Sequence, residues 1–208
     1  MTIVEEIEKL RLVPVVAIND VSKAGPLADA LAEGGLPCAE VTFRTAQAAE
    51  AIKEMSKRGD ICLGAGTVLK IDQVKEALDN GATYIVSPGF NPKVVGYCVD
   101  NNIPIFPGIS NPTDIEMALE FDLKIVKFFP AEAFGGLKTL KAMSAPYNML
   151  RFIPTGGIGA HNIMDYLAFD KIVACGGSWM VKGDLIDSAN FAEITRLTKE
   201  AMKLIGGK

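Results

Sequence analysis

The 208-residue chain has few of the residues that bind metals or form disulfide frameworks. It contains one histidine, His161, and four cysteines with no CxxC pair among them. A catalytic zinc usually takes several His or Cys ligands, so a metal-dependent mechanism is not expected. Cys38, Cys62 and Cys175 fall in apolar runs, and we expect them to be small core residues rather than redox or metal ligands.

The chain also lacks a cluster of Lys or Arg and any apolar run long enough to span a bilayer. Its formal net charge is −4, which argues against a nucleic acid or an anionic membrane as partner. Residues 1–12, MTIVEEIEKLRL, predict a charged amphipathic helix without a signal-peptide pattern. We therefore expect a cytoplasmic protein, and the length suits one domain over residues 1–208.

Short β-branched runs alternate with amphipathic segments such as 23–34 and 71–80, whose apolar residues have helical spacing. Alternation of strand and helix favours a parallel sheet, and eight such units in about 200 residues match the lower size limit of a (β/α)8 TIM barrel. The competing fold is an open doubly wound sheet, but residues 157–159 lack the third glycine of a dinucleotide fingerprint. The expected strands are 13–18, 38–43, 61–65, 84–86, 104–106, 125–128, 151–153 and 172–174.

Two neighbouring units share a turn pattern after their strands. SPGFNP (87–92) follows the fourth expected strand, and FPGISNP (106–112) follows the fifth. In both, Pro-Gly suits a turn, the asparagine is a good helix cap and the second proline suits the first helical position. We therefore expect a helix to begin at the end of each pattern.

Ionisable side chains occur inside two strands that otherwise look buried. Glu40, Thr42 and Arg44 share one face of the second strand, because side chains alternate across a strand. Lys127 lies in KIVKFFP (124–130), and the interior is a cheaper place for its ammonium than the aliphatic helix layer. We expect Glu40, Arg44 and Lys127 to line one interior surface near the strand ends, where barrel active sites lie. A bend that exposes Lys127 to water, and a structural ion pair at the rim, are the simpler alternatives.

A lysine in a confined apolar site is also typical of a nucleophile. Desolvation penalises the charged ammonium, and the uncharged amine can attack a carbonyl carbon. The sequence therefore favours a reactive role for Lys127 over a purely structural one.

Glycine pairs follow the seventh and eighth expected strands, in TGG (155–157) and GGS (176–178). The loops at these two positions form the usual phosphate site of a TIM barrel. Glycines let backbone N–H groups approach an anion without a basic side chain. The pattern therefore favours a phosphate site, with simple tight turns as the alternative.

Seven motifs occur in order along nearly the whole chain: EVTFRT (40–45), GAGTV (64–68), SPG (87–89), PGIS (107–110), KFFPAE (127–132), PTGGI (154–158) and GGSW (176–179). With these motifs the sequence resembles the family of 2-keto-3-deoxy-6-phosphogluconate (KDPG) and 4-hydroxy-2-oxoglutarate (KHG) aldolases. The resemblance implies a class I aldolase that uses neither a cofactor nor a metal and forms a homotrimer of TIM barrels.

The resemblance also implies a role for individual residues. By match to KFFPAE, Lys127 is expected to form a Schiff base with the keto acid. By match to EVTFRT, Glu40 is expected to shuttle protons and Arg44 to bind the carboxylate. The other implied substrate-binding residues are Thr67, Pro88, Phe129 and Thr155 around the keto acid, and Gly156, Gly157, Gly176, Gly177 and Ser178 around the phosphate.

The expected reaction cleaves KDPG to pyruvate and glyceraldehyde 3-phosphate, and/or KHG to pyruvate and glyoxylate. The expected partners are thus a small 2-keto acid and a phosphorylated aldehyde. The alternatives are an aldolase for a related sugar-acid phosphate such as the galactonate analogue, a barrel that uses Lys127 only electrostatically, and a non-catalytic sugar-phosphate-binding barrel. Many relatives carry a basic residue near the end of the first strand, where this chain reads AIND (17–20), so the preferred aldehyde is open.

Overall fold

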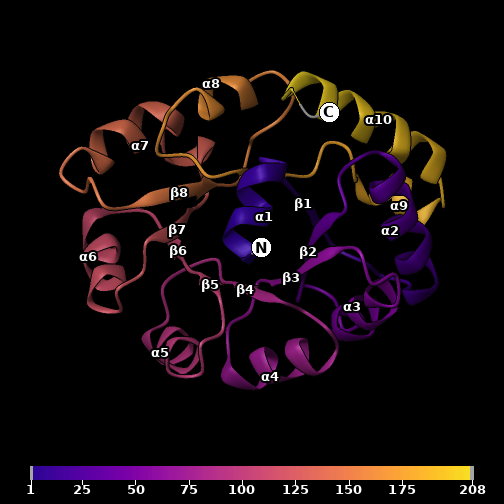
Figure 1. Ribbon diagram of the computed structural model, residues 1–208, viewed down its shortest axis with the longest axis horizontal. Helices are drawn as coiled ribbons and strands as arrows, with labels where there is room; N and C mark the ends of the chain where they lie inside the picture. Colours follow the sequence, from indigo (N-terminus) through magenta and orange to yellow (C-terminus); the bar gives the residue numbers. More distant parts are fainter. Residues whose placement is uncertain (1, 207–208) are drawn as a thin grey trace.

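The computed structural model describes residues 2–206 and has an α/β fold in which strands and helices alternate along the chain (Figure 1). The strands are β1 Leu12–Val16, β2 Cys38–Thr42, β3 Cys62–Gly66, β4 Tyr84–Val86, β5 Ile105–Phe106, β6 Gly108–Ile109, β7 Ile125–Phe128, β8 Arg151–Pro154 and β9 Cys175–Gly177. The α-helices are α1 Ile3–Leu10, α2 Ala24–Glu33, α3 Ala48–Ser56, α4 Ile71–Asp79, α5 Pro92–Asp100, α6 Pro112–Glu120, α7 Gly136–Ser144, α8 Ile163–Leu167, α9 Gly183–Asp187 and α10 Phe191–Leu204. Two 3-10 helices are η1 Val21–Lys23 and η2 Glu132–Phe134.

The strands pair in parallel and form two sheets, in the orders β5-β4-β3-β2-β1-β9 and β6-β7-β8. Isolated parallel bridges, Phe152 with Ile172 and Thr155 with Gly176, connect the region of β8 to that of β9. Figure 1 shows the strands around a common centre, with helices α2 to α8 outside them. The predicted α/β class with parallel strands is confirmed.

The expected N-terminal helix is present as α1, and its apolar side faces the core. A capping box fixes its start: the Thr2 side chain accepts from the Glu5 N–H, and the Glu5 carboxylate accepts from the Thr2 N–H. Ile7 is completely buried, and α1 lies across the middle of the strands in Figure 1. Because β1 begins directly after α1, the helix covers the end at which the parallel strands start.

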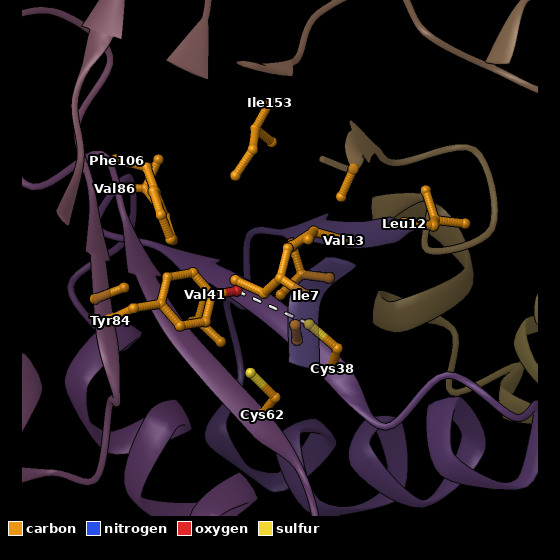
Figure 2. Close-up of a cluster of buried hydrophobic side chains, with 14 of the residues drawn as sticks. Ile7, Leu12, Val13, Cys38, Val41, Cys62, Tyr84, Val86, Phe106 and Ile153 are labelled. Carbon is orange, nitrogen blue, oxygen red and sulfur yellow. Dashed lines mark hydrogen bonds between the residues drawn. The ribbon is translucent and has the colours of Figure 1, made fainter. Parts of the chain in front are cut away.

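Figure 2 shows the part of the buried core around Ile7 of α1, with Cys38 and Cys62 among its side chains. Cys38 and Cys62 are register partners on β2 and β3, and Cys38 Sγ lies 3.9 Å from Tyr84 Oη. Burial raises the pKa of the Tyr84 hydroxyl well above its ordinary value. All four cysteines are free and buried, which confirms the prediction for Cys38, Cys62 and Cys175 and adds Cys98 to the core.

The paired turn patterns begin helices α5 and α6 as predicted. The Asn91 side chain accepts from the Lys93 N–H, and the Asn111 side chain accepts from the Asp114 N–H. In each helix a proline occupies the first turn, where its missing N–H costs no hydrogen bond. Both prolines and both caps therefore have the positions that the sequence indicated.

The prediction for the last strand was wrong by three residues. Of residues 172–174, only Ile172 pairs, in a single bridge, whereas β9 starts at Cys175 and pairs with β1. Gly176 and Gly177, expected in a loop after the strand, therefore belong to it. Strand propensity points to the β-branched residues and away from glycine. In the structure the space above the glycines is filled, since a Cβ on Gly176 would lie 2.3 Å from Thr155 Oγ1.

The fifth expected strand, 104–106, corresponds to β5, but a further short strand that was not expected, β6, follows it where the sequence predicted a Pro-Gly turn. β5 and β6 lie on either side of Pro107, which has no N–H to donate to a neighbouring strand. The Pro107 carbonyl still accepts a hydrogen bond from the Lys127 N–H at 2.9 Å. This hydrogen bond holds the residue between β5 and β6 against β7.

Candidate active site

Lys127 on β7 and Glu40 on β2 form a buried ion pair. Lys127 Nζ donates to Glu40 Oε1 at 3.2 Å, and the two side chains are 7% and 5% exposed. The alternative in which the chain bends to expose Lys127 to water is therefore wrong. Two buried charges are expensive to desolvate and are poor evidence for a stabilising role, so the pair is a candidate for chemistry.

The surroundings below this pair are apolar and closely packed. A cavity of about 10 Å³ adjoins the two charged side chains, which is at the lower limit of the space that one water molecule needs. Figure 2 shows several of its walls. The lining residues besides the pair are Ile7, Val13, Tyr84, Val86, Phe106 and Ile153. On the side of α1 there is therefore no room for a substrate beside Lys127.

Phe129 connects the amine to a larger pocket. Lys127 Nζ lies 5.2 Å from the centroid of the Phe129 ring, in the range of a cation–π contact. Phe129 in turn lines a pocket of about 180 Å³. The other lining residues are Val15, Arg44, Thr155, Gly156, Gly157, Ile158, Gly176, Gly177 and Ser178. The pocket thus gathers eight of the residues that the sequence nominated, next to Lys127.

Arg44 enters this pocket from the end of β2. Its Nε donates to Thr42 Oγ1 at 2.9 Å, and the Thr42 hydroxyl donates to the Val16 carbonyl at 2.8 Å. Thr42 is 2% exposed. One guanidinium nitrogen, Nε, is therefore used to hold Arg44 in place. The other two remain for a bidentate contact with a carboxylate or phosphate.

The glycine loop after β8 has a backbone that only glycine adopts readily. Gly156 and Gly157 have φ of +102° and +77°, the left-handed region. Consecutive residues of this kind can form a concave row of N–H groups that suits an anion. The loop after β7 packs on them, since the Ala131 N–H donates to Thr155 O at 2.8 Å and the Glu132 N–H donates to Gly156 O at 3.0 Å. These two backbone hydrogen bonds therefore join the segment that follows the Lys127 strand to the glycine loop.

The Thr155 hydroxyl is a polar atom without a partner. Thr155 is 7% exposed, and its Oγ1 makes no hydrogen bond within residues 2–206. Buried polar groups nearly always have a partner. Thr155 lines the pocket, so a molecule bound there is the nearest available source of a partner for this hydroxyl.

Two nominated residues lie outside both cavities. Thr67 directly follows β3, and Pro88 comes shortly after β4; both are half-buried. Thr67 has φ of +56°, a strained conformation for a threonine that is often found at functional sites. The structure therefore places Thr67 and Pro88 at strand ends, and within the described chain neither lines the pocket with Arg44.

Sequence reasoning missed four residues of this region. Val15 and Ile158 are apolar wall residues of the pocket, and no chemical signal marks such residues in a sequence. Thr42 was placed on the correct face, yet its bond to Arg44 was not foreseen. Gly66 belongs to GAGTV, but only coordinates show that the Glu40 side chain lies across it.

Other depressions have a different character. One of about 220 Å³ has mostly apolar walls, including Val4 and Ile103, and one of about 530 Å³ lies beside Glu132 and Tyr166. Neither includes Lys127. Between residues 2 and 206, no three His, Cys, Asp or Glu side chains group as a metal site would need, and no helix is long and apolar enough to cross a membrane.

Comparison with known proteins agrees with this geometry. The family model for KDPG and KHG aldolase matches residues 3–197. The 2-dehydro-3-deoxy-phosphogluconate aldolase of Haemophilus influenzae is 52% identical over 98% of this chain and 96% of its own. The enzyme of that name from Treponema pallidum is 47% identical over 99% of both chains.

A solved structure shares both fold and sequence. It is KDPG aldolase from Legionella pneumophila with pyruvate captured at low pH as a covalent carbinolamine intermediate. It is 33% identical, covers 96% of this chain and 98% of its own, and has a TM-score of 0.92. Together with these relatives, the parallel α/β fold and the buried lysine–carboxylate pair identify the protein as a lyase of the aldolase class. The chain belongs to the KDPG and KHG aldolase family.

Proposed function

We propose that this protein is a class I aldolase whose Schiff base forms on Lys127. It cleaves KDPG to pyruvate and glyceraldehyde 3-phosphate, and KHG to pyruvate and glyoxylate. The observation that carries the proposal is the buried contact between Lys127 Nζ and Glu40 Oε1 at 3.2 Å, beside the pocket that contains Arg44 and the glycine pairs.

Schiff-base formation needs an uncharged amine. Lys127 Nζ donates its hydrogen bond directly to the Glu40 carboxylate, so transfer of that proton gives a neutral amine and a neutral acid. The amine then attacks C2 of the keto acid and forms a carbinolamine. Glu40 returns the proton to the carbinolamine oxygen, which leaves as water, and the iminium remains on Lys127.

Cleavage then uses the iminium as an electron sink. Glu40, again a carboxylate, takes the proton of the C4 hydroxyl, the C3–C4 bond breaks, and its electron pair moves to the iminium nitrogen. The aldehyde leaves and an enamine remains. Glu40 returns the proton to C3 of the enamine, and hydrolysis of the new iminium releases pyruvate and the Lys127 amine.

The pocket residues position the two ends of the substrate. Arg44 binds the carboxylate through its free guanidinium nitrogens, and Thr155 and Phe129 line the keto-acid end. Thr67 and Pro88 lie outside this pocket, near the ends of β3 and β4, and are assigned to the keto-acid end by resemblance to the family alone. The phosphate lies against backbone N–H groups, which suit an anion where no basic side chain is at hand. The residues of that subsite are Gly156, Gly157, Gly176, Gly177 and Ser178.

Reduction of the imine tests the proposal. Pyruvate with borohydride should add one reduced pyruvyl group at Lys127, and Lys127→Ala should lose both the adduct and turnover. Lys124→Ala is the matched control, because Lys124 comes just before the same strand but is exposed. An adduct on another lysine, or turnover in Lys127→Ala, would contradict the proposal. A purely electrostatic Lys127, or a non-catalytic binding protein, would give no adduct at all.

A substrate panel separates the remaining readings. KDPG, its galactonate analogue and KHG differ in C4 configuration or in the aldehyde half, so kcat/KM for each identifies the preferred aldehyde. We expect KDPG to be preferred over KHG, because the glycine pocket has a use only for a phosphorylated aldehyde. Preference for the galactonate analogue would assign the chain to that neighbouring activity.

We further propose that residues 1–208 form one domain, a closed (β/α)8 TIM barrel. The two bridges between the regions of β8 and β9, and the hydrogen bond from the Lys127 N–H to Pro107 O, support this closure. By resemblance to the family we also propose a homotrimer that needs no cofactor or metal. From its composition and charge we propose a cytoplasmic protein that binds no nucleic acid. Light scattering coupled to size exclusion tests the trimer.

A further inference from the structure

The Glu40 side chain lies across a glycine of the neighbouring strand. Glu40 is the register partner of Gly64, and Thr42 is the register partner of Gly66. A Cβ built on Gly66 would lie 2.2 Å from Glu40 Oε1, 2.7 Å from Cγ and 2.8 Å from Cδ. The Glu40 side chain therefore extends along β3 from its register partner Gly64 to Gly66. Its Cγ atom as well as its carboxylate lies against Gly66.

The conformation of Gly66 does not explain why the residue is glycine. Gly66 lies inside β3, and its φ is not in the left-handed region. An alanine would fit the backbone, so the contact with Glu40 is the constraint. Real Cβ atoms are essentially never closer than 3.0 Å to such neighbours, and therefore Glu40 must move if Gly66 gains a side chain.

Glu40 has little room to move without leaving Lys127. It is 4% exposed, and the cavity beside it measures about 10 Å³. The space over Gly64, two residues earlier on β3, is also filled. A Cβ built on Gly64 would lie 2.1 Å from Cε2 of the Tyr84 ring. Gly64 and Gly66 share one face of β3 and form a slot that Tyr84 and Glu40 fill.

We infer that Gly66 is a positioning residue of the aldolase reaction: its missing side chain holds the Glu40 carboxylate within reach of Lys127 Nζ. The inference rests on the proposed role of Glu40. An alanine at position 66 turns the Glu40 stem away and lengthens the 3.2 Å contact on which proton transfer depends. A misplacement of about 1 Å in a reacting group can cost roughly 10²-fold in rate.

A double-mutant cycle tests this inference. Gly66→Ala, Glu40→Ala and the double variant are compared by kcat for KDPG cleavage and by melting temperature. Gly66→Ala should lower kcat by roughly 10²-fold, whereas in the Glu40→Ala background it should change kcat by less than about twofold. Glu40→Ala removes the clashing atoms, so the melting temperature lost in Gly66→Ala should be regained in the double variant.

Gly64→Ala is the matched control, because it crowds Tyr84 from the same face of the same strand. Its effect on kcat should depend on Glu40 less than that of Gly66→Ala does, because a side chain at position 64 reaches Glu40 only through the Tyr84 ring. Equal factors for Gly66→Ala in both backgrounds, wild-type kcat in Gly66→Ala, or the same coupling at Gly64 would overturn the inference.

Folding outcomes are also informative. If Gly66→Ala does not fold but the double variant does, the clash with Glu40 is supported, whereas failure of both overturns it. Failure of the proposed function appears elsewhere in the cycle, as wild-type kcat in Glu40→Ala alone. The melting temperatures would then still report whether Gly66 accommodates this side chain.

Discussion

Arg44 is held by Thr42 through a single hydroxyl oxygen. That oxygen accepts from Arg44 Nε at 2.9 Å, while its own hydrogen goes to the Val16 carbonyl at 2.8 Å. Since the Thr42 proton is used, its oxygen can only be an acceptor for the guanidinium. Thr42 thus sets the plane in which Arg44 presents its other two nitrogens to the pocket.

Removal of that acceptor should weaken substrate binding. Thr42→Val keeps the shape but loses both hydrogen bonds, so Arg44 loses its orientation. We expect KM for KDPG to rise about 10-fold, the worth of one hydrogen bond to a charged group, with a smaller change in kcat. Thr42→Ser, which keeps the hydroxyl, should restore KM. A structural role alone would lower the melting temperature of Thr42→Val and leave KM unchanged.

Replacement of the Glu40 base should affect turnover rather than binding. Glu40→Gln keeps size and hydrogen bonding but cannot take the C4 hydroxyl proton. We expect kcat to fall by roughly 10²–10⁴-fold, the usual worth of general acid–base catalysis, with KM changed little. Steady-state kinetics with KDPG measures both quantities. Glu40→Gln with wild-type kcat would show that another group moves these protons.

Much of this arrangement follows from strand periodicity. Alternation of side chains placed Glu40 and Lys127 on interior faces, and their contact at 3.2 Å agrees with that prediction. The turn patterns at Asn91 and Asn111 also predicted their helices, because capping depends on a few adjacent residues. Local chemistry of this kind can be read from a sequence.

Contacts between strands could not be read in this way. β9 contains glycines because Thr155 and Trp179 occupy the space above them, and no local propensity reports which distant side chain fills a space. The same holds for Gly66 under Glu40. The sequence identified the polar ends of the strands, whereas the packing that orients them is a property of neighbouring strands.

The phosphate subsite can be tested at Ser178 without disturbing the strand. Gly177 is less suitable, because a Cβ there would lie 2.2 Å from the Trp179 ring. Ser178 is exposed and lines the pocket. Ser178→Asp places a carboxylate against the phosphate, so KM for KDPG should rise at least about 10-fold, the effect of some 1.4 kcal/mol of repulsion.

KHG has no phosphate and serves as the internal control for Ser178→Asp. Its KM should change by less than about threefold, and Ser178→Ala should have a small effect on both substrates. Equal losses on KDPG and KHG, with an unchanged melting temperature, would show that the phosphate does not bind at Ser178.

Chelation should leave the enzyme active. In the proposed mechanism the iminium on Lys127 accepts the electrons that a metal-dependent aldolase would stabilise with a divalent cation. We therefore expect wild-type kcat after dialysis against EDTA. A large loss of activity that a divalent cation restores would assign the chain to the metal-dependent class. Borohydride trapping on the dialysed protein is the accompanying control.

The buried thiol of Cys175 should make the fold sensitive to alkali. Burial raises the pKa of this thiol from 9.0 to about 12. Above pH 9 the unfolded chain loses this proton while the folded chain keeps it, so the unfolded state binds fewer protons and the free energy of unfolding falls as pH rises. The stabilisation that comes from the buried protonated thiol is complete below the pKa of Cys175 in the unfolded chain. It is lost as the pH rises toward the pKa of Cys175 in the folded protein.

Cys175→Ala removes this titration and tests the assignment. Urea unfolding between pH 8 and pH 11 should give a slope with pH that is shallower in the variant by about 1.4 kcal/mol per pH unit near pH 10–11, the value for one proton. Other buried groups with raised pKa values, Cys98 and Tyr84 among them, titrate with the same sign and remain in both proteins. The difference between the slopes of the wild type and of Cys175→Ala cancels the contribution of these groups. It also cancels the free energy of unfolding that is lost because the substitution leaves a cavity. Identical slopes would mean that the Cys175 thiol reaches solvent in the folded protein.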